Sequence, residues 1–101
     1  MDFLTIREKD LKEIQKHYEK TNDVKIFEQL MGISIVLGKI DVFKYFKEKC
    51  KGKYNKRKVV ENIYYASCLK LDFESPAQIE HDEFNEYTCE YLLERYKDEL
   101  N

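Results

Sequence analysis

The chain has 101 residues, the usual size of a single domain with a modest hydrophobic core. Hydrophobic residues make up 43% of the sequence and aromatic residues 14%, which excludes a wholly disordered chain. Charged residues reach 38% at a net charge of −2, and no apolar run has the ~18 residues that a membrane-spanning helix needs. We therefore predict that residues 1–101 form one domain with no membrane partner.

Residues that break helices are scarce, with three Gly and one Pro. Sheet proteins need a turn every ~8–12 residues, so this scarcity favours long helices. The segment Met1–Thr5 lacks the basic and apolar parts of a signal peptide, and we expect a cytoplasmic protein. The three cysteines are widely spaced and form no C-x-x-C pattern, which indicates free thiols rather than a disulfide framework or a zinc site.

The first predicted helix runs from about Ile6 to Lys20. Its start is indicated by a capping-box pattern at Thr5–Glu8, and its outer face carries charges of both signs. The polar segment Thr21–Asp23 predicts a turn that also provides the N-cap of the next helix.

The second predicted helix, Val24–Leu37, is apolar on most sides after Leu30. This pattern predicts the central and most buried element of the domain. Gly32 weakens a helix at this point, and apolar residues alternate over Ile33–Leu37. A short strand at 33–37 is therefore the alternative.

Gly38 is expected to end the second helix, and Asp41 to cap a third helix that ends near Cys50. The sequence across this junction is Leu37-Gly38-Lys39-Ile40-Asp41-Val42-Phe43-Lys44-Tyr45-Phe46-Lys47-Glu48-Lys49. This segment resembles the inner helix of an ankyrin repeat, in which a Gly, an apolar residue and an acidic residue precede an apolar, Lys-rich helix. The resemblance covers residues 37–49 only, and the Thr-Pro-Leu-His signature that opens such a repeat is absent. It implies helix-pair packing and a protein-binding role without activity or cofactor.

A polar loop is predicted over Lys51–Lys58, followed by a fourth helix over Val59–Lys70. Apolar residues alternate near the end of this helix, so a strand within 67–73 is an alternative. The segment Ser75–Gln78 combines a preferred N-cap with Pro at the first helical position, and it predicts the start of a last helix that runs to near Leu100. Together these elements predict an all-α bundle of four or five helices, with an α+β fold as the alternative.

Charge is unevenly distributed along the chain. Residues 44–58 hold eight bases and one acid, a net charge of +7, and residues 72–101 hold ten acids and two bases, a net charge of −8. The acidic ridge is defined by carboxylates at every fourth position of the last predicted helix: Asp82, Glu86, Glu90, Glu94 and Asp98. The basic patch is defined by cations around one tyrosine: Lys51, Lys53, Tyr54, Lys56, Arg57 and Lys58.

Like charges at i,i+4 destabilise a helix slightly, which indicates a cationic partner for the acidic ridge. We expect a protein–protein interaction module, an inhibitor or adaptor, whose acidic ridge contacts a basic protein surface with Tyr87, Tyr91 and Tyr96 as anchors. A plain solvated face is one alternative. Contact with the segment 44–58, in the same chain or in a homodimer, is another.

The alternative function is a nucleic-acid-associated regulator that uses segment 44–58. Lysines of the basic patch would hold phosphates while Tyr54 stacks on a base. Scarce Arg and a pI of about 5.7 speak against a dedicated nucleic-acid reader.

Catalysis is not indicated by any local motif. Neighbouring residues such as Glu80 and His81 point in different directions on a helix and cannot bind one metal ion together. Any of the three cysteines could meet His17 or His81 in space, but no local signature indicates a nucleophile–base pair, and no cofactor is predicted. The abundance of Lys, Ile, Asn, Glu and Tyr is typical of an AT-rich genome, which suggests a viral or mobile-element protein acting in the host cytoplasm.

Overall fold

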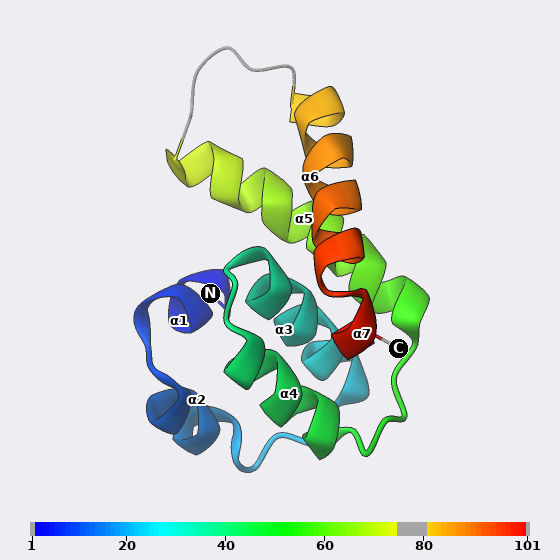
Figure 1. Ribbon diagram of the computed structural model, residues 1–101. Helices are drawn as coiled ribbons and strands as arrows, with labels where there is room; N and C mark the ends of the chain where they lie inside the picture. The colour runs from blue at the N-terminus through cyan, green and yellow to red at the C-terminus, as the bar shows by residue number, and fades with distance from the viewer. Residues whose placement is uncertain (1, 75–80, 101) are drawn as a thin grey trace.

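The computed structural model describes residues 2–74 and 81–100, with side chains for residues 2–71 and 88–100. Within these ranges the chain forms helices and no strand, so the all-α prediction is confirmed and the strands considered at 33–37 and 67–73 are wrong. The predicted count of four or five helices is too low, because the first and last predicted helices are each divided. The seven described helices are α1 (Asp2–Glu8), α2 (Leu11–Tyr18), α3 (Val24–Val36), α4 (Ile40–Lys49), α5 (Lys56–Glu74), α6 (His81–Arg95) and α7 (Lys97–Leu100) (Figure 1).

The predicted first helix is interrupted at Asp10. This residue has an extended backbone, and its carboxylate accepts a hydrogen bond from the Glu13 N–H at 2.9 Å. An aspartate at this position satisfies an N–H that the first turn of α2 would otherwise leave unpaired, which favours a new helix start. The predicted capping box at Thr5–Glu8 is wrong, because that whole segment lies inside α1.

α3 is the central element of the fold, as predicted (Figure 1). The N-cap expected within Thr21–Asp23 is Asp23, because its carboxylate accepts the Lys25 N–H at 2.9 Å. Every residue from Leu30 to Val36 is buried. α3 packs against α1, α4 and α5, which explains why this helix is apolar on nearly all sides.

The end of α3 confirms the role predicted for Gly38. Its φ of +71° lies in the left-handed region that glycine enters without strain. The Gly38 N–H donates to the Ile35 carbonyl at 3.1 Å, and the Lys39 N–H donates to the Ser34 carbonyl at 2.8 Å. These two bonds form the Schellman arrangement that closes a helix, and they turn the chain directly into α4.

The start of α4 differs from the prediction. Lys39 occupies the N-cap position without a capping side-chain hydrogen bond, and Asp41 lies in the first turn, where its carboxylate accepts the Val42 N–H at 2.8 Å. Asp41 is therefore not the N-cap. At its other end α4 finishes at Lys49, and Lys51 adopts a left-handed φ of 54°.

α5 begins earlier than the predicted residue Val59. Asn55 caps it, because its side-chain oxygen accepts the Arg57 N–H at 2.9 Å. The second half of the predicted loop Lys51–Lys58 is therefore the first turn of a helix. α5 then continues to Glu74 and includes the segment considered as a strand.

The C-terminal part of the chain forms two helices in place of one. The predicted start at Ser75–Gln78 lies outside the described residues. α6 ends at Arg95, and after Tyr96 the chain forms the short helix α7. Leu100, at the end of α7, is 2% exposed and anchors this helix in the hydrophobic core.

All seven described helices contribute to one core. Its centre is aromatic: Phe46 of α4 stacks on Phe27 of α3 at a ring-centroid distance of 5.8 Å and meets the edge of Tyr18 of α2 at 5.4 Å. Aromatic pairs at these distances add stabilisation beyond their buried area.

The buried phenol of Tyr18 makes the stability of the fold sensitive to alkaline pH. Its hydroxyl donates to Asp2 Oδ1 at 2.9 Å, and burial, followed by this contact, raises the pKa of Tyr18 above its ordinary value. A raised pKa means that the folded state holds the proton more tightly. Its contribution is therefore complete below pH ~10, the ordinary pKa, and is lost as the pH rises toward the folded pKa. We expect the free energy of unfolding, measured in urea, to fall above pH ~10.

Tyr18→Phe is expected to flatten this alkaline fall, because the substituted ring has no proton to lose. Tyr65→Phe, at an exposed tyrosine, is the control and should retain the wild-type slope. Equal slopes for wild type and Tyr18→Phe would mean that Tyr18 ionises as it does in the unfolded chain.

Candidate functional site

The acidic ridge is divided between two helices. Glu90 and Glu94 are exposed on α6, and Asp98 is exposed on α7. The break between α6 and α7 interrupts the regular four-residue spacing, so Asp98 does not continue the same helical face. Glu94 also pairs with Lys97, with Nζ and Oε1 at 3.0 Å. The side chains of the other two predicted members lie outside the described residues: Asp82 and Glu86.

The predicted aromatic anchors have different environments. Tyr91 is 56% exposed on α6. Tyr96 is half-buried, and the guanidinium of Arg95 lies over its ring at 5.5 Å from the centroid. The side chain of Tyr87 lies outside the described residues. Of the described tyrosines in this set, Tyr91 offers the larger open surface.

Two lysines of segment 44–58 donate hydrogen bonds to backbone carbonyls at the C-terminal ends of other helices. Lys49 Nζ donates to three carbonyls where α2 ends, those of Tyr18, Glu19 and Thr21, at 2.9, 3.0 and 2.9 Å. Lys47 Nζ donates to the Glu99 carbonyl in α7 at 2.7 Å. Lys39 contacts three carbonyls at the end of α1 in the same way. The last carbonyls of a helix lack intrahelical partners and carry partial negative charge, so an ammonium group stabilises them.

The remaining cations of the basic patch are at the surface: Lys51, Lys53, Lys56, Arg57 and Lys58 are all exposed. Tyr54 differs, because it is half-buried and its hydroxyl donates to the Leu100 carbonyl at 3.2 Å. Burial raises the pKa of Tyr54 above its usual value. The ring predicted to stack on a base is therefore engaged in holding the C-terminal helix.

The acidic and basic segments meet within the chain at α7. Asp98 and Glu99 line a surface hollow together with Lys44 and Lys47 of α4. This end of the acidic ridge lies beside the basic segment of the same chain. Glu90 and Glu94 lie in α6, before the helix break.

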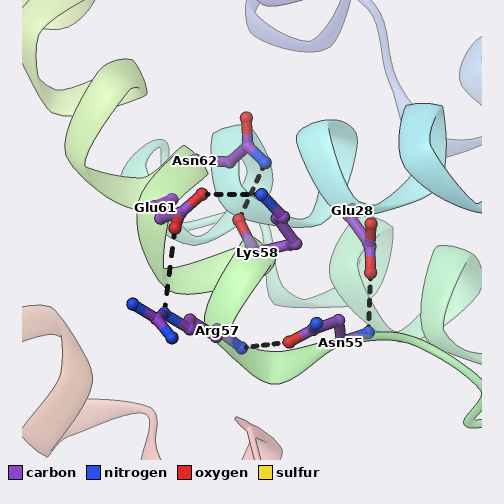
Figure 2. Close-up of polar contacts among 6 residues, drawn as sticks. All are labelled: Glu28, Asn55, Arg57, Lys58, Glu61 and Asn62. Carbon is purple, nitrogen blue, oxygen red and sulfur yellow. Dashed lines mark hydrogen bonds and ion pairs between the residues drawn. The ribbon is translucent and has the colours of Figure 1, made fainter.

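A polar cluster joins α3 to the start of α5: Glu28, Asn55, Arg57, Lys58, Glu61 and Asn62 (Figure 2). Glu28 is buried, and its carboxylate accepts the Asn55 N–H at 2.6 Å. Glu61 lies between two cations, with Arg57 Nε at 4.0 Å and Lys58 Nζ at 3.4 Å. Asn62 Nδ2 donates to the Lys58 carbonyl at 2.8 Å. The Glu28–Asn55 hydrogen bond holds the start of α5 against α3, and the other contacts lie within α5.

A groove of about 520 Å³ lies beside this cluster. Its lining includes cations, amide side chains and one aromatic ring: Lys25, Lys58, Gln29, Asn55, Asn62 and Tyr65, together with Glu28 and Glu61. Tyr65 is 66% exposed. Sequence reasoning placed Lys58 in the basic patch but missed Tyr65 and the groove. The available signal was the seven-residue spacing of Lys58 and Tyr65, which places both on one face of a helix.

The described cysteine thiols are buried or half-buried, and the described histidine, His17, is exposed. Burial raises the pKa of the Cys50 and Cys89 thiols, which disfavours the reactive thiolate. His17 is exposed and packs against Tyr18 at a ring-centroid distance of 4.7 Å. Among the described residues there is no group of three or more His, Cys, Asp or Glu that could hold a metal ion, and none of the described helices is long and apolar enough to cross a membrane.

The described residues thus present an acidic surface on α6, a basic patch at the start of α5 and a groove between α3 and α5. Comparison with known proteins finds no matching family model, no similar curated protein and no similar solved structure.

Proposed function

We propose that the protein is a non-catalytic protein–protein interaction module of the cytoplasm, an inhibitor or adaptor that presents α6 to a basic partner surface. The observation that carries this proposal is the open ring of Tyr91, 56% exposed, on the same helix as the exposed carboxylates of Glu90 and Glu94. An exposed tyrosine is a typical binding anchor. The carboxylates of Glu90 and Glu94 would accelerate the encounter with a basic partner surface and would repel acidic protein surfaces.

The ankyrin-like segment 37–49 supports the same class of role. It spans the Gly38 turn and all of α4, and α4 packs against α3 as a helix pair. Ankyrin repeats are built from helix pairs and bind proteins, so this resemblance implies interaction without catalysis.

The proposal is tested with the double variant Glu90→Lys/Glu94→Lys. A tagged wild-type protein should capture a stoichiometric protein partner from native cell lysate, and the captured amount should decrease at high salt. The double variant should capture at least about tenfold less, because like charges then oppose each other across the interface. Circular dichroism should show unchanged helicity.

Glu8→Lys/Glu19→Lys is the control, because it makes the same change in net charge at two exposed carboxylates on α1 and at the end of α2. It should capture the partner as the wild type does. Equal capture by Glu90→Lys/Glu94→Lys and wild type would contradict a role for α6, and capture lost equally by both variants would indicate net charge alone.

A further inference from the structure

The geometry points to a second binding site: the groove between α3 and α5 binds single-stranded nucleic acid, with phosphates on the cations at the start of α5 and a base stacked on Tyr65. This site is separate from the α6 surface proposed above. It shares Lys56, Arg57 and Lys58 with the basic patch expected from sequence, but its stacking ring is Tyr65, because Tyr54 is engaged in an internal contact.

The cationic side of the groove is the first turn of α5. Lys58 lines the groove. Lys56 and Arg57 precede it in the same turn of α5 and are exposed. Lys25 of α3 lines the groove as a further cation. These positively charged groups complement a phosphate backbone, and the partial positive charge at the N-terminal end of the 19-residue helix α5 adds to them.

Two acidic residues, Glu28 and Glu61, also line the groove. Glu28 is 6% exposed, and one of its oxygens accepts the Asn55 N–H at 2.6 Å, so little of its carboxylate faces the groove (Figure 2). Glu61 forms exposed ion pairs at 4.0 Å and 3.4 Å with Arg57 and Lys58. Exposed pairs of this kind contribute little stability, so phosphate oxygens can replace Glu61 at small cost.

Tyr65 provides the stacking surface. It lies seven residues after Lys58 on α5, which is nearly two helical turns and a rise of about 10 Å on the same face. Its ring is 66% exposed and lines the groove together with Gln29 and Asn62. A phosphate near Lys58 can therefore be followed by a base on Tyr65. Stacking of this kind requires an unpaired base, which favours a single strand over a duplex.

The groove extends along α5 beyond Tyr65. The same tyrosine, with Gln29 and Asn62, lines a neighbouring, mostly apolar hollow, whose other lining residues are Asp2, Phe3, Ile33, Ala66 and Leu69. A strand that passes Tyr65 therefore meets an apolar surface on which a second base can rest. Recognition by charge and stacking, without hydrogen bonds to base edges, is tolerant of sequence.

The experiment measures fluorescence anisotropy of the full chain with labelled oligothymidylate and oligouridylate of about twelve nucleotides, a length within the usual range of such sites. We expect salt-dependent binding to the single strands and weaker binding to a duplex of equal length. Tyr65→Ala should reduce affinity about tenfold through loss of one stacked base. Tyr91→Ala, at a similarly exposed tyrosine on α6, is the control and should bind as wild type.

The cations are tested with Arg57→Gln/Lys58→Gln. Loss of two phosphate contacts should reduce the slope of log affinity against log salt by about 1.4, at ~0.7 per contact for single strands. Lys12→Gln/Lys16→Gln, at exposed lysines of α2, should keep the wild-type slope. All these positions are exposed, and circular dichroism verifies that each variant is folded.

Three results would overturn the inference: no salt-dependent binding of either oligonucleotide, equal affinity for Tyr65→Ala and Tyr91→Ala, or a preference for duplex. Displacement of the oligonucleotide by polyglutamate, with no effect of Tyr65→Ala, would assign the groove to an acidic peptide instead.

Discussion

Gly32→Ala is expected to lower the free energy of unfolding by about 2–3 kcal/mol, although alanine is the better helix former by ~1 kcal/mol. The reason is the contact between α3 and α5. A Cβ atom on Gly32 would lie 2.7 Å from Asn62 Cβ, 2.8 Å from the Asn62 carbonyl carbon and 2.9 Å from the Ile63 nitrogen. Two of these atoms belong to the α5 backbone and cannot rotate away, so the helices must separate.

This separation should also affect the proposed groove, because α3 and α5 form its two walls. Urea unfolding should show the lower free energy of unfolding of Gly32→Ala. Thermal unfolding should show a melting temperature about 8 to 20 °C below that of the wild type, for a domain of this size. Gly52→Ala is the control: no atom lies within 4 Å of its added Cβ, and its φ of +72° alone should cost about 1 kcal/mol. Equal losses for the two variants would mean that α3 and α5 tolerate a larger spacing.

Lys49→Met is expected to lower the free energy of unfolding by about 2 kcal/mol. Methionine keeps the apolar stem of the side chain and removes the ammonium group that holds three carbonyls at the end of α2. The same ammonium lies 5.3 Å from the centroid of the Phe27 ring, so the substitution also removes a cation–π contact. Carbonyls left without a donor would destabilise the end of α2 first.

The measurement combines urea unfolding with amide hydrogen exchange in α2. Lys53→Met, at an exposed lysine four positions later, is the control and should change stability by less than about 0.5 kcal/mol. Exchange in α2 should increase in Lys49→Met and remain unchanged in Lys53→Met. Equal stability of the two variants would contradict a capping role for Lys49.

Local sequence predicted the features that depend on neighbouring residues. The segment Thr21–Asp23 and Gly38 were correctly identified as helix ends, because a cap accepts an N–H within the same turn and a left-handed residue is needed at the point of reversal. The same reasoning was wrong for Thr5 and Asp41, which lie inside helices. A capping side chain indicates where a helix can start, and packing selects among these positions.

Which lysines and tyrosines of the candidate sites are exposed could not be predicted from the sequence. Lys49 and Lys53 are similar in sequence context, yet one caps α2 and the other is exposed. Tyr54 lies within the basic patch but is bound to Leu100, whereas Tyr65, outside it, is the open ring beside the groove. These assignments depend on contacts between residues far apart in the chain, which no local pattern records.

The sequence by itself determined that this protein is helical, because residues that break helices are scarce and helices satisfy the backbone hydrogen bonds locally. It also determined that α3 is the buried centre, because a helix that is apolar on nearly all sides must be covered by other elements. Only the tertiary structure decided which charged and aromatic side chains reach the surface. A long lysine or tyrosine side chain can extend into solvent or pack onto another helix. Which placement has the lower free energy depends on hydrogen bonds to residues far away in the sequence, and these form only when the chain folds.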